Sequence, residues 1–109
     1  MIENVRLMLM DDSEVVIPLA DIKDLVTTYS FVRDKCYEFK VFVKDTVEGI
    51  EIVKENTIKY VAFEYDDCDV IEAVKVPFKE KNGINTAQRT WDAGDGFIGI
   101  HFKYSKEGK

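Results

Sequence analysis

The sequence predicts a mainly β protein, a small antiparallel β-sandwich or β-barrel of about eight strands. Three observations support this prediction. Apolar and polar residues alternate along many short stretches, turn-forming residues separate these stretches, and the first half of the chain repeats itself. The 109 residues suffice for one core, so we expect a single domain at residues 1–104 and a flexible tail at residues 105–109.

The repeat concerns architecture and not chemistry. Residues 5–11 reappear 34 positions later as residues 39–45, with apolar residues matching apolar residues and an aspartate at the end of each copy. After two single-residue insertions, residues 22–29 align with residues 58–65 in the same way. The pattern predicts a duplicated unit of three strands, with its two copies side by side.

The first copy begins with a predicted hairpin. Residues 5–9 and 15–17 are apolar stretches on either side of an acidic turn. Pro18 lacks a backbone donor, so it ends the returning strand or confines it to a sheet edge. Residues 20–31 fit helical spacing and also alternate, and their match to residues 58–65 favours an extended segment. We expect at most one short helix, near residues 20–28.

The second copy continues with alternation. Residues 37–43 form a predicted half-buried strand, and Gly49 turns the chain into a further strand at residues 50–52. Residues 57–65 are apolar on nearly both faces and should form a central strand.

The C-terminal third adds three predicted strands. Pro77 indicates that the strand at residues 70–78 is an edge or carries a bulge. Asn82-Gly83 is the strongest hairpin signal in the chain and leads into a polar strand at residues 84–91. The Asp- and Gly-rich residues 92–96 then turn the chain into the last strand, residues 97–104.

The net charge of −6 is unevenly distributed. Residues 1–74 contain 17 acidic and 8 basic side chains, whereas residues 75–109 contain 4 acidic and 7 basic ones. An acidic front repels the phosphates of duplex nucleic acid, so the C-terminal third is the surface expected to face an anion.

The cellular setting is inferred from what the sequence lacks. The N-terminus has no apolar stretch typical of a signal peptide, and no apolar run has the length of a membrane span. Cys36 and Cys68 are therefore expected to be reduced thiols in the cytoplasm.

No pattern typical of catalysis or metal binding is present. His101 is the only histidine, and alternation puts it on the outer side of its strand, so a zinc site is not expected. The acidic loop at residues 66–69 lacks the spacing of a calcium site, and residues 92–96 are explained by a turn. We predict no catalytic residues, no cofactor and no metal.

Two sets of residues are candidates for binding. The first is basic and aromatic and would hold a small anion, with Trp91 and Arg89 supplying stacking and charge. It comprises Lys79, Lys81, Arg89, Trp91, His101 and Lys103. The second is acidic and would face another protein. It comprises Asp11, Asp12, Glu14, Asp66, Asp67 and Asp69.

The leading hypothesis for function is a non-enzymatic protein-binding module, namely an inhibitor, adaptor or assembly subunit. The composition, rich in Lys, Glu and Ile, suggests a bacterium or a phage, in which case the setting is the host cytoplasm. One alternative is a protein that binds or sequesters a nucleotide or another small anion, and a second is a minimal metal-dependent hydrolase that uses residues 66–69. Edge strands near Pro18 and Pro77 also lead us to expect a homodimer, and we expect neither membrane nor duplex nucleic acid as a partner.

Overall fold

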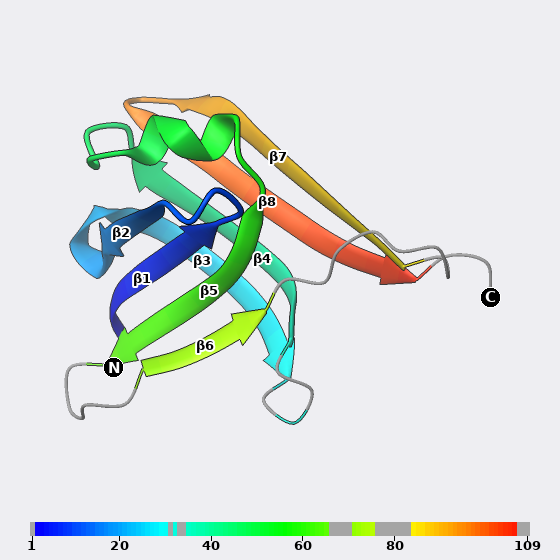
Figure 1. Ribbon diagram of the computed structural model, residues 1–109. Coiled ribbons are helices and arrows are strands. Elements are labelled where there is room, and N and C mark those ends of the chain that lie inside the picture. Colours follow the sequence, from blue (N-terminus) through cyan, green and yellow to red (C-terminus); the bar gives the residue numbers. More distant parts are fainter. Residues whose placement is uncertain (1, 31, 33–34, 66–70, 76–83, 107–109) are drawn as a thin grey trace.

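The computed structural model describes residues 2–30, 32, 35–65, 71–75 and 84–106. Within these ranges the chain forms eight strands and two short 3₁₀ turns (Figure 1). The strands are β1 (Ile2–Leu9), β2 (Glu14–Pro18), β3 (Ile22–Ser30), β4 (Lys35–Lys44), β5 (Ile58–Tyr65), β6 (Ile71–Lys75), β7 (Ile84–Gly94) and β8 (Phe97–Lys106). The turns are η1 (Leu19–Asp21) and η2 (Ile50–Lys54). No helix of the described residues has the length and apolar composition needed to cross a membrane.

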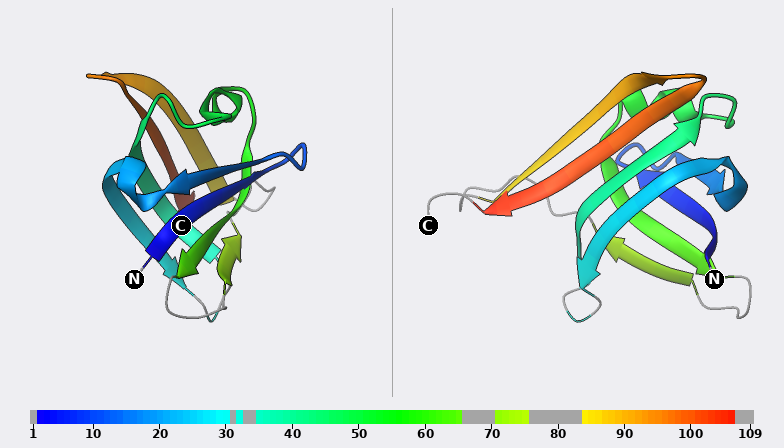
Figure 2. Two further views of the ribbon diagram at one scale, coloured as in Figure 1. Left: turned by 90° about the vertical axis from the view of Figure 1, so that its left-hand side faces the viewer. Right: turned by 180° about the vertical axis from the view of Figure 1, so that it is seen from behind.

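The strands form a sandwich of two antiparallel layers, which confirms the predicted fold class. One layer has the order β2-β1-β5-β6 and the other β3-β4-β8-β7. The layers join at one corner, where Lys35 of β4 and Lys75 of β6 form a single parallel pair. The β7–β8 hairpin extends beyond the rest of the body (Figure 2).

The core lies between the two layers and is built by alternation. Every second residue of the central strands points inward, as Val5, Leu7 and Leu9 do in β1. Its largest fully buried side chains are Phe39, Phe63 and Phe102. The rings of Phe39 and Phe102 stack with their centroids 5.6 Å apart, which links β4 to β8 within one layer.

The repeat in the sequence reappears in the pairing of the strands. β1 pairs with β5 and β4 pairs with β3, both antiparallel. Leu7 faces Val61 in the first pair, and Val41 faces Leu25 in the second, so each residue has its counterpart at the position that the repeat predicts. Both pairs also carry a register shift at each end, and these shifts fall at equivalent residues.

The arrangement of the two copies differs from the prediction. Each copy gives its third strand to the first strand of the other, so the copies are interleaved and do not lie as separate units side by side. The interleaving joins residues from both halves in one core.

The strand predicted at residues 50–52 is wrong, because this segment is the 3₁₀ turn η2. Gly49 precedes it with a φ of 81°, which reverses the chain without the strain that a Cβ would add. Ile50 and Val53, three residues apart, are both buried, whereas Ile52 is 38% exposed. The spacing of apolar residues is thus close to three, as a 3₁₀ turn requires, and not two.

Other predicted elements are found where the structure describes them. Residues 22–30 are extended and follow the short turn η1, as the repeat favoured. Pro18 ends β2, an outer strand of its layer. Pro77 and Asn82-Gly83 lie outside the described residues. β8 reaches Lys106, so it includes the first two residues of the segment expected to be a tail.

Gln88 fastens the β7–β8 hairpin to the body. Its Oε1 accepts a hydrogen bond from the backbone N–H of Ile58 at 2.9 Å, and its Nε2 donates to the carbonyl oxygens of Asn56 at 2.9 Å and Val53 at 3.4 Å. One half-buried amide therefore serves three backbone groups around the end of η2 and the start of β5.

We predict that Gln88→Met lowers the free energy of unfolding by about 1–3 kcal/mol, because the N–H of Ile58 loses its partner. Urea denaturation measures this change. Lys103→Met, on the exposed side of β8, is the control and should change stability by less than about 0.5 kcal/mol. Equal midpoints for the two variants would show that Gln88 does not hold the hairpin.

Candidate functional site

The outer side of the β3-β4-β8-β7 layer brings together basic and aromatic side chains from all of its strands. Along each strand every second side chain points into the core, and the side chains between them point outward. The basic and aromatic residues occupy these outward positions. One row across the layer runs through Val26, Lys40, His101 and Arg89. We call this surface the aromatic-basic face. It consists of Lys23, Asp24, Val26, Glu38, Lys40, Phe42, Arg89, Trp91, Phe97, Gly99, His101 and Lys103.

Trp91 lies flat on the backbone of Gly99, its partner across the β7–β8 pair. A Cβ built on Gly99 would clash with carbons of the indole, so only glycine leaves room for the ring. Phe42 of β4 approaches the same indole edge-on, with centroids 5.8 Å apart and an interplanar angle of 90°. The indole is therefore held by Gly99 on one face and by a T-shaped contact with Phe42.

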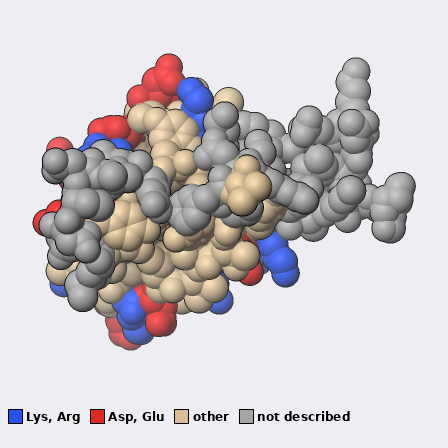
Figure 3. Space-filling view, turned by 90° about the horizontal axis from the view of Figure 1, so that it is seen from below, with Lys and Arg blue, Asp and Glu red and all other residues tan. Residues whose placement is uncertain are grey.

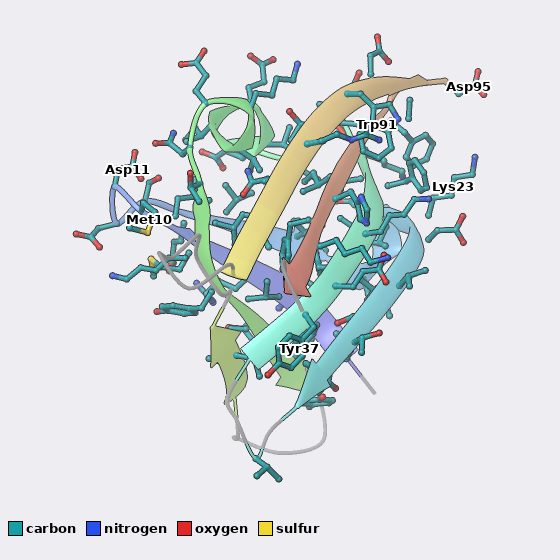
Figure 4. The ribbon with its side chains drawn as sticks, turned by 90° about the vertical axis from the view of Figure 1, so that its right-hand side faces the viewer. Met10, Asp11, Lys23, Tyr37, Trp91 and Asp95 are labelled. Carbon is teal, nitrogen blue, oxygen red and sulfur yellow. The ribbon has the colours of Figure 1, made fainter. Side chains whose placement is uncertain are left out.

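Each large aromatic ring of this face has a cation above it. Arg89 lies 5.4 Å from the ring centroid of Trp91, Lys40 lies 5.7 Å from that of Phe42, and Lys23 lies 5.4 Å from that of Phe97. Such pairs contribute about 0.5–1 kcal/mol each at exposed sites. Figure 4 labels Lys23 and Trp91 at the same end of the layer.

His101 and Glu38 form a hydrogen-bonded pair at the centre of the face. Its Nε2 lies 3.1 Å from Oε2 of Glu38, and both side chains keep partial contact with solvent. The hydrogen bond from His101, together with the nearby charges of Lys103 and Lys40, lowers the pKa of Glu38. Glu38 is thus held as a carboxylate between cations.

Four residues of the predicted anion-binding set share this face, namely Arg89, Trp91, His101 and Lys103. The other two, Lys79 and Lys81, lie outside the described residues. Sequence reasoning missed four further residues of the face, which are Lys23 of β3, Lys40 and Phe42 of β4, and Phe97 of β8. Alternation along residues 37–43 places Lys40 on the outward side of its strand. The same pattern places Phe42 there, so both residues could have been included.

The described part of the predicted acidic set is engaged within the protein. Asp11 accepts hydrogen bonds from the N–H of Ser13 at 3.0 Å and from its hydroxyl at 2.5 Å, and these bonds lower the pKa of Asp11. Glu14 pairs with Arg6 at 2.6 Å, and Asp12 lies 3.5 Å from Nζ of Lys59. Asp11 is far from Trp91 in Figure 4, on the opposite side of the molecule. Asp66, Asp67 and Asp69 lie outside the described residues.

Arg6 organises the outer side of the other layer. It bridges Glu14 and Glu64, and Oε2 of Glu64 lies 2.7 Å from Nη2 of Arg6. The hydrogen bond to Glu64 is the largest cause of a raised pKa of Arg6. Two carboxylates and one guanidinium leave this cluster with a net charge of −1, so it lacks the excess of cations found on the aromatic-basic face.

The remaining described groups provide little for catalysis. Cys36 is a free thiol with no exposed surface, and burial raises its pKa to about 11, so it is protonated and unreactive near neutral pH. Among the described residues, no three His, Cys, Asp or Glu side chains are grouped to hold a metal ion. The underside of the sandwich exposes mainly uncharged described side chains, with charged ones toward its margins (Figure 3).

We predict that Gly99→Ala destabilises the protein by about 1–3 kcal/mol, because the added methyl group displaces the indole of Trp91. Trp91→Ala removes the obstacle, so the same glycine substitution should cost much less in that background. Thermal unfolding of wild type, both single variants and the double variant measures the coupling. Additive effects would mean that Trp91 does not rest on Gly99.

Comparisons with protein-family models, with curated proteins and with solved structures find no match to this chain. We therefore infer its function from the residues of the aromatic-basic face.

Proposed function

We propose that this protein is a non-enzymatic binding module that recognises a partner protein through the aromatic-basic face. The observation that supports it is the presence of three cation–aromatic pairs side by side on one accessible sheet surface. Trp and Arg are enriched among the residues that dominate binding energy in protein interfaces, and charged groups typically surround them. A role as inhibitor, adaptor or assembly subunit in the cytoplasm is in keeping with the reduced, buried thiol of Cys36.

The charge of the face defines the partner. Lys23, Lys40, Arg89 and Lys103 outnumber Asp24 and Glu38, whereas the chain as a whole has a net charge of −6. A local positive surface on an acidic protein attracts a partner that presents carboxylates, and it orients that partner during approach. We infer a partner segment that combines acidic side chains with apolar ones, the latter contacting Trp91, Phe42 and Val26.

A nucleotide or short single strand is the second candidate, and the pairing of Arg89 with Trp91 favours it. Base stacking needs an open ring face, however. Gly99 covers one face of the indole, and Arg89 lies 5.4 Å from its centroid. A base could stack only after Arg89 moved away, whereas a protein side chain can pack on the arrangement as it is.

The test selects ligands from a displayed library of random peptides. We predict that the wild-type protein enriches peptides with acidic and apolar residues, and that their affinity falls as salt is added. The double variant Lys40→Glu/Arg89→Glu should weaken binding of the selected peptides by about tenfold or more. Fluorescence of Trp91, the only tryptophan, reports occupancy of the face.

Lys54→Glu/Lys59→Glu is the matched control, because it makes the same change of charge on η2 and β5, away from the face. It should leave peptide affinity within about twofold of wild type. Equal loss in both double variants, or enrichment of peptides without acidic residues, would contradict the proposal. Binding of mononucleotides or oligothymidylate in place of peptides, abolished by Lys40→Glu/Arg89→Glu, would favour the second candidate.

A further inference from the structure

A comparison of the two repeated strand pairs shows that, within the described part of the chain, one edge of β3 lacks a neighbouring strand. β3 and β5 occupy equivalent places in the two copies, since β3 pairs with β4 as β5 pairs with β1. β5 has a second neighbour, β6, which covers residues 60–64. Among the described residues, β3 pairs with β4 only, so the equivalent edge at residues 24–28 has no strand beside it.

The composition of this edge is unusual for a strand that has to remain unpaired. Residues 25–30 of β3 contain no charged residue, no proline and no glycine. Outer strands normally avoid pairing with other chains through lysine, proline or short length. The outer strand β2 follows this rule, with five residues, Glu14 at its start and Pro18 at its end. β3 has nine residues, and its two charged residues, Lys23 and Asp24, both lie at its start.

The side chains along β3 also remain accessible. Val26 is 52% exposed, and it is one of four large hydrophobic side chains that the described residues expose strongly. A second one, Val32, lies two residues beyond the end of the strand and is 98% exposed. Exposed apolar residues next to an unpaired backbone edge are a common feature of surfaces that accept an added strand.

We propose that β3 pairs antiparallel with β3 of a second copy of this chain and forms a symmetric homodimer. A second copy of β3 is the expected partner strand, because the sequence of this edge is complementary to itself in an antiparallel pair. A two-fold axis at Thr27 sets Val26 opposite the partner's Thr28 and Asp24 opposite the partner's Ser30. No charge then faces a like charge, and both Val26 side chains gain apolar neighbours.

The dimer would join the two β3-β4-β8-β7 layers into one continuous sheet, with the two aromatic-basic faces related by the two-fold axis. This location differs from the edges near Pro18 and Pro77 that the sequence suggested. It uses the backbone edge of β3 and not the cations that would recognise an acidic partner, although Val26 belongs to both surfaces.

The test compares two double variants at exposed positions of β3. In the proposed register, Val26→Lys/Thr28→Lys sets lysine opposite lysine, whereas Val26→Glu/Thr28→Lys sets opposite charges against each other. Sedimentation equilibrium should give twice the 12.6 kDa chain mass for wild type and for Val26→Glu/Thr28→Lys. Val26→Lys/Thr28→Lys should raise the dissociation constant of the dimer at least about tenfold and approach the mass of one chain. Circular dichroism and thermal unfolding verify that both variants fold.

Three outcomes would overturn the proposal. Wild type could sediment as a monomer at every concentration, both variants could remain dimeric, or both could dissociate equally. The second outcome would locate the interface on another edge, and the third would show that the register is not centred on Thr27. Because Val26 belongs to both surfaces, peptide selection is done with the wild-type protein, with Lys40→Glu/Arg89→Glu as its negative control. A monomeric wild type that still binds acidic peptides would overturn the dimer alone, whereas a dimer that binds no peptide would overturn the recognition function alone.

Discussion

The pairing of each copy's first strand with the third strand of the other copy is the constraint on which the rest of the structure depends. Side chains alternate along a strand, so a slip by one residue would turn every buried side chain to the solvent. The register that sets Leu7 beside Val61 and Val41 beside Leu25 therefore decides which residues form the core. It also decides which residues face outward, and in the second layer these are basic and aromatic.

The two copies share this scaffold but differ in what is added to it. In the first copy, β2 flanks β1, and Arg6 pairs with the carboxylates around it. In the second copy, β8 flanks β4, and β7 extends the layer outward, held by the amide of Gln88. The aromatic-basic face thus includes two strands, β7 and β8, that lie outside the repeated segments. Gly99 of β8 contributes to this face, because its lack of a side chain leaves room for the indole of Trp91.

The strands were predictable because period-two alternation has a direct physical cause in the burial of one sheet face. The 3₁₀ turn η2 was not predictable, since Ile50 and Ile52 also fit alternation, and only the packed structure shows that Val53 belongs to the core.

Arg89 and Trp91 could be recognised because they are close in sequence. Lys40 and Phe42 join them only through the β4–β8 pairing, which sets them opposite His101 and Gly99, 61 and 57 positions away. Pairing over such distances has no local signal in the sequence. The acidic set was selected by charge alone, and charge does not reveal that Glu14 is already paired with Arg6.

Backbone NMR of the isotope-labelled protein tests the duplicated pairing most directly. Cross-strand nuclear Overhauser effects should connect Leu7 with Val61 and Val41 with Leu25, and the irregularities should fall at Met8 to Leu9 and at the equivalent Phe42 to Val43. Finding both sets in one spectrum would establish the interleaved copies. Contacts of β1 with β3, or a register displaced by one residue in either pair, would contradict the account.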